Sequence, residues 1–190
     1  MKDYDILMVG VGGQGTVLSS DIVCEVALAG GSDVKKSEIH GMAQRGGSVV
    51  SHVRIGKRVS SPVLPLKGAD IILSFEDMEF LRYPEYVNDE TVLILNRYKI
   101  YPPSVASGDE NYPESQVADL KDRFSTVFEM DAMEMAQKIG NPKVAGMVLL
   151  GKLASLLHYE QEVWKEVVSK KVPPKTVELN LKAFDAGFGS

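Results

Sequence analysis

The sequence predicts an α/β fold, organised as one domain with a mostly parallel sheet flanked by helices. An apolar segment at residues 6–9 turns on a run of glycines into an amphipathic stretch that starts near Thr16. Short apolar strands then alternate with a helical pattern in the middle of the chain, which favours buried parallel strands. The C-terminal third is helical in pattern. We therefore expect a Rossmann-like domain that carries a hairpin extension and a helical C-terminal third.

Length and composition fit this expectation of a single domain over residues 1–190. The chain has 44% hydrophobic and 25% charged residues, which is ordinary for a globular protein with a proper core. No apolar run approaches the ~20 residues of a membrane span, and the first residues lack the pattern of a signal peptide. The net charge of −5 argues against general nucleic-acid binding. These observations predict a cytoplasmic protein with neither a membrane nor a nucleic-acid partner.

The individual elements follow from periodicity and from turn residues. Leu18, Ile22 and Val26 recur at helical spacing, and Gly30-Gly31 ends that helix. Gly56-Lys57 predicts a tight turn between two strands of a hairpin. Asn141-Pro142 is a good start for a helix. The predicted strands are residues 6–9, 34–39, 48–55, 58–64, 71–75, 91–95 and 126–128. The predicted helices are residues 16–29, 78–86 and 143–157, one around Trp164 and one from Pro174, and residues 101–116 are predicted to be a long surface loop.

The first glycine run is a candidate anion site. A strand that turns sharply into a helix aims unpaired backbone N–H groups and the positive end of the helix dipole at one point, where a phosphate or carboxylate can bind. Gly13 removes a side chain where the ligand would approach most closely. The alternative is a turn that is tight for packing reasons only. The candidate binding residues of this run are Gly10, Gly12, Gly13, Gln14, Gly15 and Thr16.

The same run formally satisfies the G-x-G-x-x-G pattern of dinucleotide-binding proteins, but the context departs from theirs. Such a site also needs a strand that ends in an acidic residue roughly 20 positions after the glycines. Glu38 lies near that distance. However, the next predicted elements are another glycine loop and a hairpin, where a Rossmann unit has a helix. We therefore favour a phosphate-binding loop over nicotinamide chemistry.

The second glycine cluster carries the other candidates. Arg45-Gly46-Gly47 places a guanidinium, the side chain best suited to grip a phosphate or carboxylate, beside two residues that let a ligand approach. Gln44 and His40 flank it with further hydrogen-bonding groups. Arg45 and His40 are the candidates for a place near a reacting centre. The alternatives are an arginine that closes a turn and a structural histidine, which we also expect of His52 and His158.

The sequence offers no self-sufficient catalytic apparatus. Cys24 lies in the first helix among apolar neighbours, so we expect it to be buried and unreactive. One cysteine excludes an internal disulfide and an iron–sulfur cluster carried by this chain alone, since a cluster needs about four thiolates. No spacing of His, Cys or carboxylates suggests a metal site. Binding groups without catalytic groups predict a subunit of a larger enzyme.

Two motifs carry a family resemblance. Gly-Val-Gly-Gly-Gln-Gly at residues 10–15, together with Ser-Glu-Ile-His-Gly-Met-Ala-Gln-Arg-Gly-Gly-Ser at residues 37–48, resembles the gamma subunit or domain of 2-oxoacid:ferredoxin oxidoreductases. Within that family the chain is most similar to the small (beta) subunits of indolepyruvate ferredoxin oxidoreductases. The similarity continues through Glu76 and reaches the Asn180-x-x-Ala183-Phe184-x-x-Gly187 segment, so it covers essentially the whole chain.

The resemblance implies a division of labour. The assembled enzyme would oxidatively decarboxylate an aryl 2-oxoacid with coenzyme A (CoA), giving an acyl-CoA, CO2 and reduced ferredoxin. A larger partner subunit would hold thiamine diphosphate, its Mg2+ and the [4Fe-4S] clusters, and would form a hetero-oligomer with this chain. Residues 12–16 would hold a CoA phosphate, and Arg45, helped by Gln44, would hold an anionic group near the reacting centre. A free-standing dinucleotide-binding or regulatory module and a purely structural subunit remain the alternatives.

Overall fold

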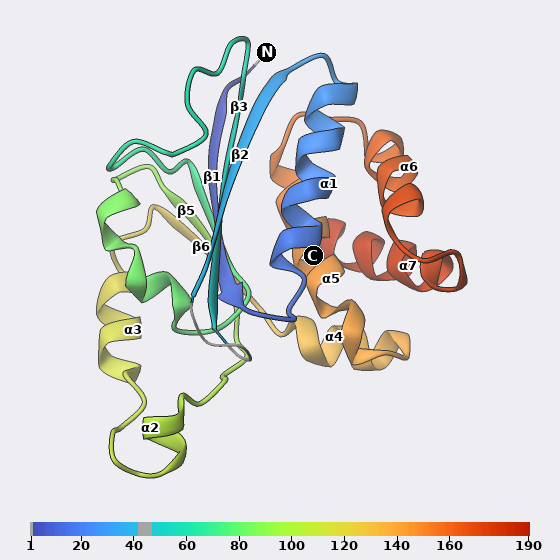
Figure 1. Cartoon of the computed structure of the whole chain (residues 1–190). Helices are drawn as coiled ribbons and strands as arrows, with labels where there is room; N and C mark the ends of the chain where they lie inside the picture. Colours follow the sequence, from blue (N-terminus) through green and yellow to red (C-terminus); the bar gives the residue numbers. More distant parts are fainter. Residues whose placement is uncertain (1, 42–46) are drawn as a thin grey trace.

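The computed structural model describes residues 2–41 and 47–190, which form one six-stranded sheet with helices on both faces (Figure 1). The strand order across the sheet is β2-β3-β1-β4-β5-β6. The strands are β1 (Tyr4–Val11), β2 (Asp33–His40), β3 (Ser48–Gly56), β4 (Ile71–Ser74), β5 (Val92–Asn96) and β6 (Thr126–Met130). The α-helices are α1 (Thr16–Ala29), α2 (Pro103–Ala106), α3 (Glu114–Lys121), α4 (Ala132–Ile139), α5 (Ala145–Leu156), α6 (Gln161–Lys171) and α7 (Val177–Phe188).

The sheet has a parallel half and an antiparallel half. Strands β1, β4, β5 and β6 are parallel to one another, with Met8 opposite Leu73 and Leu73 opposite Ile94. Strand β3 pairs antiparallel with both β1 and β2. The carboxyl ends of four parallel strands therefore share one edge of the sheet, which is where ligands bind in open α/β sheets.

The predicted hairpin lies one element earlier than the sequence indicated. Strand β3 pairs with β2, the strand before it, and residues 58–64 form no strand. Pro62 and Pro65 lack an N–H for a ladder, and the Val59 N–H donates to the Asp33 carboxylate at 2.7 Å. Because β3 already has β1 and β2 as its two neighbours, residues 58–64 could not add to it. The prediction of a hairpin that turns at Gly56-Lys57 was therefore wrong.

Buried strands explain why both faces of the sheet are covered. On β1, Ile6 and Met8 point to one face and Leu7 and Val9 to the other, and all four are fully buried. Helices α1 and α4–α7 cover the first face, and α3 with the 3-10 turn η1 (Glu79–Arg82) covers the second (Figure 1). Strands that are apolar on both sides fold as parallel strands between helices.

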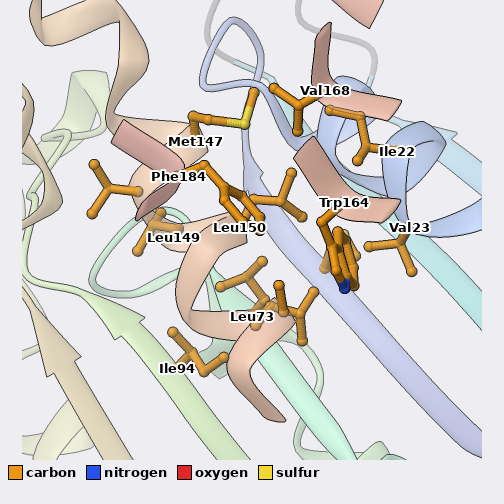
Figure 2. Packing of buried hydrophobic residues seen from close by; sticks show 14 of the residues in the cluster. Ile22, Val23, Leu73, Ile94, Met147, Leu149, Leu150, Trp164, Val168 and Phe184 are labelled. Carbon is orange, nitrogen blue, oxygen red and sulfur yellow. The ribbon is translucent and has the colours of Figure 1, made fainter. Parts of the chain in front are cut away.

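The larger core lies under the C-terminal helices. Trp164 of α6 stacks on Phe184 of α7 with ring centroids 6.1 Å apart, and both side chains are fully buried (Figure 2). Ile22 and Val23 of α1 belong to the same cluster. Burial of each such side chain contributes about 1.5–3 kcal/mol. The predicted helical C-terminal third is confirmed, and its function is to cover one face of the sheet.

Other sequence predictions need correction. The helix expected over 78–86 is two 3-10 turns, η1 and η2 (Pro84–Tyr86), because Pro84 supplies no N–H to continue a helix. The predicted loop 101–116 contains α2 and the first turn of α3. Helix α4 was not predicted, although Asp131 caps it by accepting from the Glu134 N–H at 2.9 Å, which is a recognisable start signal.

Two glycines set the distance between α5 and α7. A Cβ at Gly187 would overlap the carbonyl of Val148, and one at Gly151 would overlap the carbonyl of Phe184. The two helices can therefore approach this closely only because neither residue has a side chain.

We expect Gly187→Ala to destabilise the chain by about 1–3 kcal/mol, because the added methyl forces the two helices apart. The matched control is Gly189→Ala, whose Cβ would meet only the Asp185 oxygen at 3.6 Å, and its effect should stay within about 0.5 kcal/mol. Urea unfolding followed by circular dichroism measures both. Equal stabilities of the two variants would contradict the close helix crossing.

Candidate functional site

A half-open hollow of about 330 Å³ lies at the carboxyl edge of the sheet. It is bounded by the ends of β1, β4 and β5 and by the start of α5, and its lining is mostly apolar. The lining residues are Gly12, Gly13, Gln14, Phe75, Asn96, Tyr98, Ile100, Met133, Pro142, Lys143, Ala145, Gly146 and Leu149. The first predicted glycine loop therefore forms one side of this cavity.

Glycine is required at different positions of this loop for different structural reasons. Gly13 and Gly15 have φ of 95° and 94°, which L side chains rarely adopt. A Cβ at Gly10 would lie 2.8 Å from Cβ of Phe75 and 2.9 Å from Oγ1 of Thr16, so this position is set by packing. A Cβ at Gly13 would meet nothing within 4 Å. The backbone is therefore exposed to a ligand at Gly13, whereas Gly10 has the packing role of the alternative interpretation.

Backbone N–H groups at this turn are available to an anion. The Gly12 N–H donates to the Gly47 carbonyl at 2.9 Å, and the Gln14 N–H donates to the Val11 carbonyl at 3.2 Å. Within residues 2–41 and 47–190, the amides of Gly13, Gly15 and Thr16 donate to no acceptor. These three amides lie at the start of α1, where the helix dipole adds positive potential.

Two amide side chains hold the floor of the hollow. Gln14 accepts from the Val11 N–H through Oε1 at 2.7 Å and donates through Nε2 to the Phe75 carbonyl at 3.0 Å. Asn96 donates through Nδ2 to the same Phe75 carbonyl at 2.9 Å and accepts from the Ala132 N–H at 3.2 Å. The Gln14 side chain therefore stabilises the loop, and its amide group is already hydrogen-bonded to the protein backbone. Asn96 was missed by the sequence reasoning, although a polar residue that ends an apolar strand is a detectable signal.

Thr16 lies beneath the loop. Its side chain is 3% exposed, and Oγ1 has no hydrogen-bond partner among the described residues. Thr16 is not among the described residues that line the hollow.

The second glycine cluster meets the first. Gly47 accepts the Gly12 N–H, as given above, and the Gly41 N–H donates to the Ser48 carbonyl at 2.7 Å. The structure thus brings Gly47 to the loop. Gln44, Arg45 and Gly46 lie outside the described residues.

The candidate histidine His40 points elsewhere. Its side chain is 59% exposed, and Nε2 lies 2.6 Å from the Glu38 carboxylate, which also pairs with Lys36 at 2.7 Å. These contacts are on β2, the edge strand, and His40 is not among the residues that line the hollow. His52 is 3% exposed, its ring packs against Tyr86, and burial lowers its pKa. The prediction of a structural His52 is confirmed.

Lys143 supplies the positive charge that the sequence reasoning did not find. It is exposed, it lines the hollow, and it forms no ion pair with a described residue. It lies in the 3-10 turn η3 (Pro142–Val144), whose cap Asn141 accepts the Lys143 N–H at 3.0 Å. A Cβ at Gly146 would lie 2.6 Å from the Gln14 carbonyl, so the start of α5 packs directly on the glycine loop. This packing brings Lys143 to the site.

The remaining reactive groups do not form a second centre in the described part of the chain. No group of three or more His, Cys, Asp or Glu side chains is placed there to hold a metal ion. None of the described helices is both long and apolar enough to cross a bilayer. Cys24 is half-buried on α1, and burial raises the pKa of its thiol to about 11.

Fold and site together define an α/β domain with an exposed, anion-receptive glycine loop beside an apolar hollow. Over residues 5–190 the chain matches the family described as pyruvate ferredoxin/flavodoxin oxidoreductase, and it belongs to that family. A curated relative, indolepyruvate oxidoreductase subunit IorB of Archaeoglobus fulgidus, is 40% identical over 97% of this chain and 93% of its own length. The chain is therefore a small subunit of the 2-oxoacid:ferredoxin oxidoreductase type.

Solved structures share the fold. The gamma subunit of keto/oxoacid ferredoxin oxidoreductase from Geobacter sulfurreducens has a TM-score of 0.72 and 25% identity, covering 98% of this chain and 96% of its own. A structure of 2-oxoglutarate:ferredoxin oxidoreductase from Magnetococcus marinus, with 2-oxoglutarate, coenzyme A and succinyl-CoA bound, has a TM-score of 0.74 and 21% identity. The match covers 100% of this chain and 31% of the Magnetococcus marinus chain. The α/β fold predicted from the sequence is confirmed, with a mixed sheet.

The raised pKa of Cys24 gives a chemical test of its burial. At pH 8 a thiol of pKa about 11 is about 0.1% thiolate, against roughly a quarter for a free thiol. We expect iodoacetamide to alkylate the folded chain at pH 8 at least about a hundredfold more slowly than the urea-unfolded chain, with the rate rising as the pH approaches 11. Similar rates in the two states would show that the thiol is open to solvent.

Proposed function

We propose that this chain is the small subunit of an aryl 2-oxoacid ferredoxin oxidoreductase of the indolepyruvate type. The assembled enzyme would make an acyl-CoA, CO2 and reduced ferredoxin from the 2-oxoacid and CoA. The contribution of this chain is a glycine-rich site for the anionic part of CoA. The observation that carries the proposal is the acceptor-free amide of Gly13, which lines a mostly apolar hollow, with the acceptor-free amides of Gly15 and Thr16 next along the same turn.

The residues present fit CoA. Its diphosphate needs N–H donors and room for a close approach, which the amides and the side-chain-free position at Gly13 provide. The hollow offers hydrocarbon from the half-buried Ile100 and Met133 to an uncharged part of the same molecule. CoA, when bound, supplies the thiol that accepts the acyl group. The chain's own part is to bind and orient the cofactor and to exclude water from one side of it.

Lys143 would add a charge-assisted contact to a CoA phosphate at the rim of the hollow. Arg45 and Gln44 are proposed, from the family motif, to hold a further anionic group near the reacting centre. Together these groups would make this end of the sheet selective for a polyanionic cofactor.

A [4Fe-4S] cluster does not fit this chain, and the family resemblance implies that thiamine diphosphate and Mg2+ belong to the same partner as the clusters. Four thiolates are needed for a cluster, and the sequence has only Cys24. We place these groups on the larger partner subunit, with ferredoxin reached through the complex. The curated relatives named as indolepyruvate oxidoreductase subunits support both the partner and the substrate class.

A nicotinamide dinucleotide fits less well than CoA. In a Rossmann unit, the acidic residue for the ribose ends a parallel strand next to the glycine strand. Here β3 runs antiparallel beside β1 and separates it from β2, which carries Glu38. Glu38 is already engaged by Lys36 and His40. Glu76 follows β4, the parallel neighbour of β1, but it is 1% exposed and both of its carboxylate oxygens accept hydrogen bonds within the chain. Neither Glu38 nor Glu76 is therefore free to bind a ribose.

Reconstitution with the large partner tests the proposal. We expect this chain to restore 2-oxoacid- and CoA-dependent reduction of ferredoxin to the large subunit. Lys143→Ala should raise KM for CoA about tenfold, because one charge-assisted phosphate contact is lost, while KM for the 2-oxoacid stays unchanged.

The matched control is Lys175→Ala. Lys175 lies in η4 (Pro174–Thr176), a 3-10 turn that also begins with proline, and it is not part of the hollow. This variant should behave as wild type. Full CoA-dependent activity of the large subunit alone, unimproved by this chain, would refute the proposed function.

A further inference from the structure

We propose that Glu76 is a positioning residue for CoA, which holds the segment 97–101 as a wall of the hollow opposite the glycine loop. This inference rests on the proposed function, since it concerns the same hollow. Glu76 itself does not line the cavity. It lies directly after Phe75 at the end of β4, with 1% of its surface exposed.

The Glu76 carboxylate accepts four hydrogen bonds, two on each oxygen. Oε2 accepts from the backbone N–H groups of Met78 at 2.7 Å and Glu79 at 3.1 Å. Oε1 accepts from the Ile100 N–H at 2.9 Å and from the Tyr112 hydroxyl at 3.2 Å. One oxygen is therefore fixed by the turn that follows β4, and the other holds a segment that follows β5.

The segment held by Glu76 is a wall of the cavity. Tyr98 and Ile100 both line the hollow. The Asp77 N–H donates to the Tyr98 carbonyl at 3.0 Å, so the two residues after Phe75 hold alternate positions of the wall. Since Phe75 also accepts from Gln14 of the glycine loop, the loop and the wall are fixed on the same short stretch, residues 75–77.

Besides the Asp77–Tyr98 bond, two further interactions hold this wall. The last ladder-like bond is from the Arg97 N–H to the Met130 carbonyl at 2.8 Å. Lys99 pairs with Glu114 at 2.8 Å, but this pair is exposed, and such pairs contribute about 0–1 kcal/mol. The amide of Ile100 has Glu76 as its acceptor. Hydrogen bonds to a buried charge are the stronger kind.

Tyr112 extends the same arrangement to the connection between β5 and β6. Its hydroxyl also lies 3.4 Å from the Asp77 carboxylate, its ring packs edge-on against Tyr101, and Lys99 lies 4.7 Å from its centroid. Burial raises the pKa of Glu76, and the nearby Glu79 carboxylate acts in the same direction, whereas the hydrogen bonds from Ile100, Met78 and Tyr112 oppose it. The carboxylate is thus held by neutral donors, which an amide cannot replace.

Glu76→Gln in the reconstituted enzyme tests this role. The variant keeps the shape of the side chain but turns an NH2 group toward two donors, so either the turn at 78–79 or the wall at 100 loses its acceptor. We expect KM for CoA to rise about tenfold, with KM for the 2-oxoacid and kcat within twofold of wild type. Tyr112→Phe, which removes one donor without changing the packing, should raise KM for CoA about threefold and should melt as wild type does.

The matched control is Asp70→Asn. Asp70 precedes β4 as Glu76 follows it, and its carboxylate accepts the Asp5 N–H at 2.7 Å at the opposite edge of the sheet. We expect both KM values of this variant to equal those of wild type, even if its melting temperature falls. An unchanged KM for CoA in both Glu76→Gln and Tyr112→Phe would overturn the inference, and so would an equal rise in KM for the 2-oxoacid.

Failure of this inference is distinguishable from failure of the proposed function. If Lys143→Ala raises KM for CoA and the Glu76 and Tyr112 variants do not, the hollow binds CoA without help from Glu76. If none of the three variants changes KM for CoA, the cofactor does not bind at this hollow and both proposals fall.

Discussion

The candidate site depends on the carbonyl oxygen of Phe75. It accepts hydrogen bonds from Gln14, of the loop after β1, and from Asn96, at the end of β5. The opposite ends of these two amides hold Val11 and Ala132, so each side chain is satisfied on both sides. Leaving one such buried group unpaired costs about 1–3 kcal/mol. The ends of three parallel strands are therefore fixed relative to one another before any ligand arrives.

This rigidity explains how a loop of small residues can act as a binding site. Amides at Gly13 and Gly15 can hold an anion only if they point at the same place, and Gln14 between them fixes the turn. The close packing of α5, permitted by Gly146, adds Lys143 to the rim. Preorganised donors of this kind lose little entropy when they bind a ligand.

The chain has candidate binding groups for an anion but too few cysteines to carry an iron–sulfur cluster. Its binding groups gather at one edge of the sheet, while most of its remaining surface elements serve to cover the two faces. In the proposed assembly, a subunit built in this way would present CoA and leave electron transfer to a partner with the necessary thiolates. Phe75 holds the glycine loop and Glu76 holds the opposite wall, so two consecutive residues after β4 link the two sides of the hollow.

The sequence by itself determined the local elements and the loop chemistry. Residues 6–9, 71–73 and 92–95 are apolar without interruption, and helices α1, α5, α6 and α7 have a periodicity that can be read directly. Only the tertiary structure decided which strands pair and which residues surround the hollow. Strand pairing is non-local, so β3 could join β1 and β2 and leave residues 58–64 unpaired. Lys143 and Asn96 line the same hollow as the glycine loop, and Glu76 holds the opposite wall, because sheet order and helix packing bring distant residues together. No spacing along the chain records that proximity.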